Sequence, residues 1–160
     1  MLGVKQTRNS MSMASLRLLI LALAVVTPGL AAAQAVHTRL APGERVIHAE
    51  TLSGRFVGWE QGDYVWARLA VPGRRAEVRG NPGASPIEFF LEANRGQLVT
   101  VQIALIRMNV PEAGGWTNLP RITAARNASG TAEQWWHGLN KHQRDQVRSR
   151  FDHALAGDQH

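Results

Sequence analysis

The chain has 160 residues, a formal net charge of +6, six histidines and no cysteine. The lack of cysteine excludes a thiol nucleophile, a cysteine metal site, a disulfide framework and a lipid-modified cysteine. A domain of this size without disulfides must depend on its hydrophobic core for stability.

The first 35 residues have the layout of a secretory signal peptide. Basic residues precede an apolar run at 18–26, and small residues at 31–35 supply a cleavage site. The apolar run is far shorter than the roughly 20 residues that a spanning helix needs. We therefore expect cleavage after residue 33 or 35, export to a bacterial periplasm, and no stable membrane span afterwards. The candidate start residues are Met1, Met11 and Met13.

Removing this signal leaves 15 basic and 12 acidic residues, a net charge of +3 on a chain of one domain's length. Such a modest charge argues against a nucleic-acid partner. We divide the chain into a signal peptide at 1–35, a flexible lead-in at 36–44, a small β-barrel domain at 45–126, and a C-terminal helix with a tail at 127–160.

A β-hairpin is predicted at residues 54–71, where two runs of strand-forming residues flank a polar tip at 60–63. Residues 45–53 alternate as a strand before it. Gly54 and Gly58 interrupt what is otherwise one long strand, and glycine inside a strand marks a bulge or a bend. A Pro-Gly turn follows at 72–73, and a short charged strand at 75–79 suits a sheet edge.

A short helix is predicted at residues 85–95. Ser85 and Glu88 form a capping box around Pro86, which suits the first helical position. Its apolar stripe consists of Ile87, Phe90 and Leu91.

Two further strands and a second helix complete the chain. Residues 98–110 form the strongest strand, with Val101 and Ile103 on its apolar face. Residues 119–125 form a strand that Pro120 places at an edge. A single amphipathic helix is predicted at 132–156, opened by a capping box at Thr131 and Gln134.

This order resembles the oligonucleotide/oligosaccharide-binding fold, a five-stranded Greek-key barrel with a long bent first strand and a helix between strands three and four. The resemblance covers about residues 45–126 and is architectural, and other small barrels such as the Src-homology-3 type remain open. We therefore expect a mainly β protein with such a barrel and a C-terminal amphipathic helix.

The resemblance implies a ligand surface on strands two and three and on the loops joining strands one to two and four to five. Aromatic and charged residues there could stack on rings and pair with anionic groups. The candidates are Trp59, Asp63, Tyr64, Trp66, Arg68, Arg75, Arg79 and Trp116. The simpler interpretation, which we favour, is that the large aromatics belong to the core.

A second candidate surface lies on the predicted C-terminal helix, where basic residues recur at helical spacing. It consists of His137, Lys141, Arg144 and Arg148 and could contact anionic lipid or a partner. Asp145 and Asp152 lie close by, so the interpretation that we favour is a solvated helix face of mixed charge. Glu60 and Asp63 lack the partners of a catalytic pair. The histidine spacings match no metal site, so we predict no catalytic residues, no metal and no cofactor.

We therefore expect an exported, non-catalytic binding module for a carbohydrate, an anionic polymer or a protein of the cell envelope. The alternative is a structural or interaction protein that docks through its tryptophan-rich C-terminal helix. An enzymatic function is the third hypothesis, because the sequence shows no catalytic constellation.

Overall fold

The computed structural model describes residues 40–83, 86–111 and 114–158. The predicted signal peptide, residues 36–39 of the lead-in and the proposed helix cap Ser85 lie outside these residues. The described chain is mainly β, as expected. Its strands are β1 (Arg45–Gln61), β2 (Val65–Ala70), β3 (Val78–Gly80), β4 (Leu98–Val110), β5 (Gly115–Asn127) and β6 (Gly130–Thr131). Its helices are α1 (Pro86–Ala93), α2 (Ala132–Gly138) and α3 (Lys141–Gly157).

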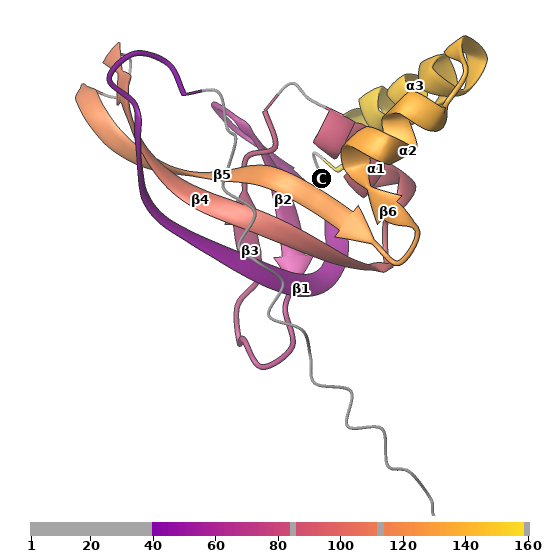
Figure 1. The fold of residues 1–160 in the computed structure, drawn as a ribbon, viewed down its shortest axis with the longest axis horizontal. Helices are drawn as coiled ribbons and strands as arrows, with labels where there is room; N and C mark the ends of the chain where they lie inside the picture. Colours follow the sequence, from indigo (N-terminus) through magenta and orange to yellow (C-terminus); the bar gives the residue numbers. More distant parts are fainter. Residues whose placement is uncertain (1–39, 84–85, 112–113, 159–160) are drawn as a thin grey trace, which may run out of the picture. The chain divides into compact units, whose positions relative to one another are not determined.

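The strands form one antiparallel sheet in the order β3-β2-β1-β4-β5-β6 (Figure 1). The predicted five-stranded Greek-key barrel is therefore not confirmed, because the sheet has six strands and does not close into a barrel. The physical reason lies in β3, which has only three residues, with Pro82 two residues after its end. Proline cannot donate to a ladder, and β3 reaches β5 only through a parallel bridge between Asn81 and Arg121.

β1 is one strand of 17 residues that pairs first with β4 and then with β2. The predicted irregularity at Gly58 is confirmed, because the register with β2 shifts between Phe56 and Gly58. Gly54 stays in register opposite Val99. A Cβ at Gly54 would lie 2.8 Å from the Ala70 carbonyl oxygen, so glycine is needed where β1 passes close to the end of β2.

β5 is longer than predicted, and it is not the edge strand that Pro120 suggested, because it lies between β4 and β6. The Pro120 carbonyl accepts a hydrogen bond of 2.8 Å from the Asn81 N–H, on the side of β5 away from β4. Backbone groups of one strand residue point the same way, so the missing N–H of Pro120 leaves the β4 ladder intact.

The core lies between the sheet and the helices, which gather at one end of the sheet while the β4–β5 hairpin extends at the other (Figure 1). α1 buries the predicted stripe of Ile87, Phe90 and Leu91. β4 buries Val101 and Ile103, as its alternation predicts.

The prediction of one continuous C-terminal helix is wrong, because α2 ends at Gly138 and α3 begins at Lys141. Asn140 has extended backbone, its side chain accepts from the Gln143 N–H at 3.0 Å, and the Gln143 side chain accepts from the Asn140 N–H at 2.9 Å. This second capping box starts a new helix rather than continuing the first. Among the helices of the described residues, none is long and apolar enough to cross a membrane.

Candidate functional site

The outer side of β2 and its two neighbouring strands carries half of the predicted ligand-binding residues. Alternation along β2 buries Ala67 and Leu69 and turns Trp66 and Arg68 outward. Cross-strand partners share a side of the sheet, so the residues opposite these two also point outward. We call this surface the β2 face; its residues are Glu60, Tyr64, Trp66, Arg68, Glu77 and Arg79.

An aromatic pair occupies one end of the β2 face. The rings of Tyr64 and Trp66 meet edge to face, with centroids 6.0 Å apart and planes at 75°. Both residues are half-buried, and Trp66 lies directly opposite Glu60 of β1. Apolar ring surface, the Tyr64 phenol and the Glu60 carboxylate therefore lie close together on neighbouring strands.

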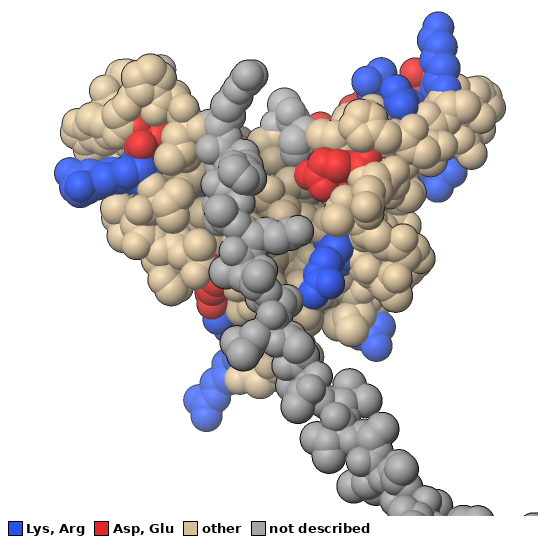
Figure 2. Space-filling model, viewed as in Figure 1, with Lys and Arg blue, Asp and Glu red and all other residues tan. Residues whose placement is uncertain are grey.

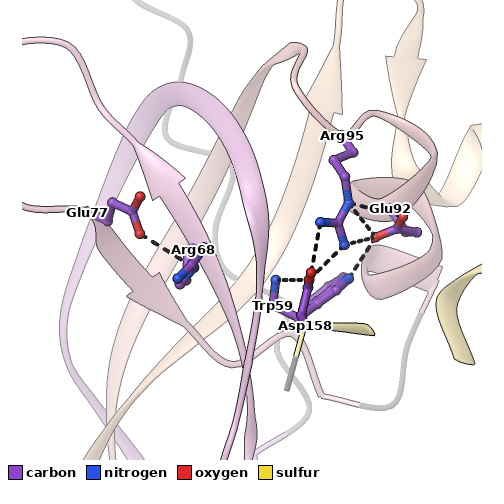
Figure 3. Close-up of polar contacts among 6 residues, drawn as sticks. All are labelled: Trp59, Arg68, Glu77, Glu92, Arg95 and Asp158. Carbon is purple, nitrogen blue, oxygen red and sulfur yellow. Dashed lines mark hydrogen bonds and ion pairs between the residues drawn. The ribbon is translucent and has the colours of Figure 1, made fainter. Parts of the chain in front are cut away.

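Charged groups on the β2 face compensate one another. Arg68 and Arg79 lie directly opposite each other, an arrangement that is destabilising for like charges. Arg79 pairs with Glu60 at 3.0 Å. Arg68 pairs with Glu77 at 3.5 Å, and Figure 3 shows this second pair. The Arg68 Nε is buried and makes no hydrogen bond. Two cations and two carboxylates thus leave this surface without net charge.

Trp59 does not belong to the β2 face, which corrects its place among the ligand-binding candidates. It pairs with Ala67 on the inward side and is 1% exposed. Its ring packs against Phe56 and Phe151, with centroids 4.8 and 5.1 Å away. The simpler interpretation of a core tryptophan is confirmed here, because burial leaves no ring face for a ligand.

Trp116 is the opposite case, being 54% exposed at the far end of the β4–β5 hairpin. It lies five residues before Arg121, where Asn81 bridges from β3, and five extended residues span about 17 Å. Trp116 therefore stands apart from the β2 face. Asp63 and Arg75 are exposed in the connections before and after β2.

Most of the aromatic surface of α2 serves to pack the helices together. Trp136 stacks on Phe89 of α1, with centroids 5.0 Å apart and planes at 18°. The guanidinium carbons of Arg144 and Arg148 each lie 5.4 Å from the centroid of Trp136. The predicted basic stripe is thus divided, since His137 belongs to α2 and the other three residues to α3. Figure 2 shows basic side chains projecting from the outer end of α3.

A polar network that the sequence analysis missed joins α1, β1 and the end of α3 (Figure 3). Arg95 donates to Glu92 and to Asp158, at 2.9 Å in each case. Glu92 accepts from the Trp59 indole N–H at 2.8 Å, and Asp158 accepts from the Trp59 backbone N–H at 3.0 Å. The three-residue spacing of Glu92 and Arg95 was the available signal. No sequence pattern signalled the contact between Arg95 and Asp158, because the two residues are 63 positions apart.

The network sets the pKa values of its charged members. Burial is the largest single influence on both groups and disfavours the charged forms of Arg95 and Asp158, but their hydrogen bonds and nearby opposite charges together outweigh it. The pKa of Arg95 is raised and that of Asp158 is lowered, the latter also by the Trp59 N–H. These directions suit a structural clamp that stays ionised at neutral pH.

Glu88 of α1 is a second perturbed carboxyl. Burial, and to a smaller extent the charge of Asp152 on α3, raises its pKa to about 7. Glu88 therefore titrates near neutral pH at the packing of α1 against α3.

No protein-family model, curated protein or solved structure matches this chain. The chemistry of its own side chains is therefore the basis on which a function can be assigned.

Proposed function

We propose that this protein is an exported, non-catalytic binding module that holds a neutral carbohydrate chain on its β2 face. The observation that carries the proposal is the aromatic pair of Tyr64 and Trp66 beside two arginines whose charges are balanced by carboxylates.

The proposed architecture is a partly open barrel of the oligonucleotide/oligosaccharide-binding type. Two backbone hydrogen bonds of 2.8 Å support it, from the Asn81 N–H to Pro120 and from the Ile122 N–H to Asn81. They bring the end of β3 alongside β5 in parallel, so strands three, two, one, four and five follow one another around an incomplete ring. The helix α1 lies between β3 and β4 in the chain, as that fold requires.

The choice of a neutral sugar follows from the chemistry of the face. A sugar ring presents C–H groups on its flat side and hydroxyls around its edge. The ring of Trp66 offers an apolar surface to the C–H groups, while arginine donors and glutamate acceptors can bond to the hydroxyls. A face without net charge provides no electrostatic steering for a polyanion.

The alternative of docking through the tryptophan-rich helix has less support. One face of Trp136 is covered by Phe89, and Arg144 and Arg148 also lie against the ring. Trp135 meets Phe90 edge to face at 5.7 Å. These rings are used within the molecule, which leaves little of them for a partner.

Calorimetric titration of residues 36–160 with chitotetraose, cellotetraose and maltotetraose tests the proposal. We expect at least one to bind, and Trp66→Ala to weaken that binding at least tenfold. Arg79→Gln, which leaves the rings in place, should weaken it less. Trp116→Ala is the matched control and should bind as the wild type does. Equal losses for the two tryptophan variants, or binding of dextran sulfate alone, would refute a neutral glycan site on the β2 face.

A further inference from the structure

A second pair of opposed arginines lies at the other end of the sheet, near the β4–β5 turn. Arg45 of β1 is directly opposite Arg107 of β4, and Arg107 is directly opposite Asn118 of β5. Cross-strand partners share a side of the sheet, as do residues two apart in a strand. One side therefore carries what we call the Arg107 surface: Arg45, Arg107, Asn109, Trp116 and Asn118.

The charge on this surface is uncompensated. The opposed arginines of the β2 face each have a carboxylate partner, whereas among the described residues neither Arg45 nor Arg107 has one. Glu44, which precedes Arg45 in the chain, is engaged elsewhere. It pairs with Arg121 at 3.7 Å, accepts from the Ala41 N–H at 2.9 Å, and its side chain is only 10% exposed. Among the described residues, these two like charges therefore face each other with no carboxylate counterion.

An exposed ring adjoins these cations. The guanidinium carbon of Arg107 lies 5.8 Å from the centroid of Trp116. On another side, the indole lies so close to Gly43 that a Cβ there would be 3.2 Å from its Cη2. The ring is thus supported, yet about half of its surface meets solvent. An arginine that stacks on an aromatic ring keeps its N–H fork free to bind a carboxylate or phosphate.

We propose that the Arg107 surface binds the oxyanion of an acidic sugar, with the sugar ring on Trp116 and the carboxylate or phosphate between Arg45 and Arg107. This ligand differs in charge from the neutral chain assigned to the β2 face, and the two sites are independent of each other. Asn109 and Asn118 supply amide groups for ring hydroxyls on the same side of the sheet.

Titration of residues 36–160 at low and moderate salt with trigalacturonate, galactotriose and glucose 6-phosphate tests this inference. The first and third probes distinguish a carboxylate from a phosphate as the oxyanion. We expect an acidic probe to bind at least tenfold more tightly than neutral galactotriose, and salt to weaken it. Arg107→Gln and Trp116→Ala should each reduce that affinity at least tenfold.

Arg126→Gln is the matched control, because it removes the same charge from an exposed residue of β5 away from this surface. It should leave the affinity within about twofold, as should Arg79→Gln on the β2 face. Equal losses for Arg107→Gln and Arg126→Gln would overturn the inference in favour of non-specific attraction, and equal affinity for galactotriose would overturn it as well. Arg107→Gln should not lower the melting temperature, since it relieves a repulsion, and a large fall would assign Arg107 a structural role instead.

Discussion

Replacing Gly80 with alanine probes the contact between β3 and β5. Gly80 is buried on β3 and faces the core strands β4 and β5. A Cβ at this position would lie 2.6 Å from Cγ1 of Ile122 and 3.2 Å from its Cδ1. Real Cβ contacts are rarely closer than about 3.4 Å, and Ile122 is itself fully buried, so the isoleucine has no free space into which to move.

The expected loss of stability follows from these distances. Inserting a methyl group into a packed core costs about 1–3 kcal/mol. Alanine regains about 0.5–1 kcal/mol because glycine loses more backbone freedom on folding. We therefore expect Gly80→Ala to lower the free energy of unfolding by about 1–2 kcal/mol in urea melts of residues 36–160.

Two further variants test whether the loss comes from the contact between Gly80 and Ile122. Gly138→Ala is the matched control, because a Cβ there meets nothing within 4 Å, and it should be neutral or slightly stabilising. Ile122→Ala alone should cost about 2–5 kcal/mol, but in combination with Gly80→Ala the losses should be less than additive, because the clashing Cγ1 is gone. Strictly additive losses, or a Gly80→Ala variant as stable as Gly138→Ala, would show that β3 does not pack against β5.

Three other predictions concern export, the core and pH. In a bacterial host, mass spectrometry of the secreted product should find the chain beginning after residue 33 or 35, and an intact soluble cytoplasmic product would contradict the signal peptide. Ile103→Ala should lower the free energy of unfolding by roughly 2–5 kcal/mol in urea melts. Gln102→Ala, on the other side of β4, should change it by no more than about 0.5 kcal/mol. Equal losses for the two variants would show that the strand register is wrong. Glu88 has a folded-state pKa of about 7 against an ordinary 4.5, so its contribution to stability is fully present below pH 4.5 and is lost as the pH rises through 7. Allowing for partial solvent screening, wild type should lose about 1–2 kcal/mol over that interval relative to Glu88→Gln, and parallel pH profiles for the two would refute the shift.

Local signals in the amino-acid sequence determine several elements of this protein. The helix α1 follows from Pro86 and the spacing of Ile87, Phe90 and Leu91, because capping and helical periodicity act within a few residues. The strand β4 coincides with the predicted residues 98–110, since strict alternation requires only neighbours along the chain. The break before α3 is also local, because the Asn140–Gln143 capping box marks it, although the longer apolar pattern across it favours a single helix.

Only the tertiary structure decided which tryptophan is core and which is surface. Alternation gives each strand two sides but does not say which one faces inward, and the pairing of Trp59 with Ala67 settles that question here. The same holds for the two arginine pairs. Arg68 and Arg79 are 11 residues apart in the chain and Arg45 and Arg107 are 62 apart, and no local rule brings either pair together. The cross-strand register places the two arginines of each pair opposite each other. Arg68 and Arg79 have carboxylate partners, whereas among the described residues Arg45 and Arg107 have none.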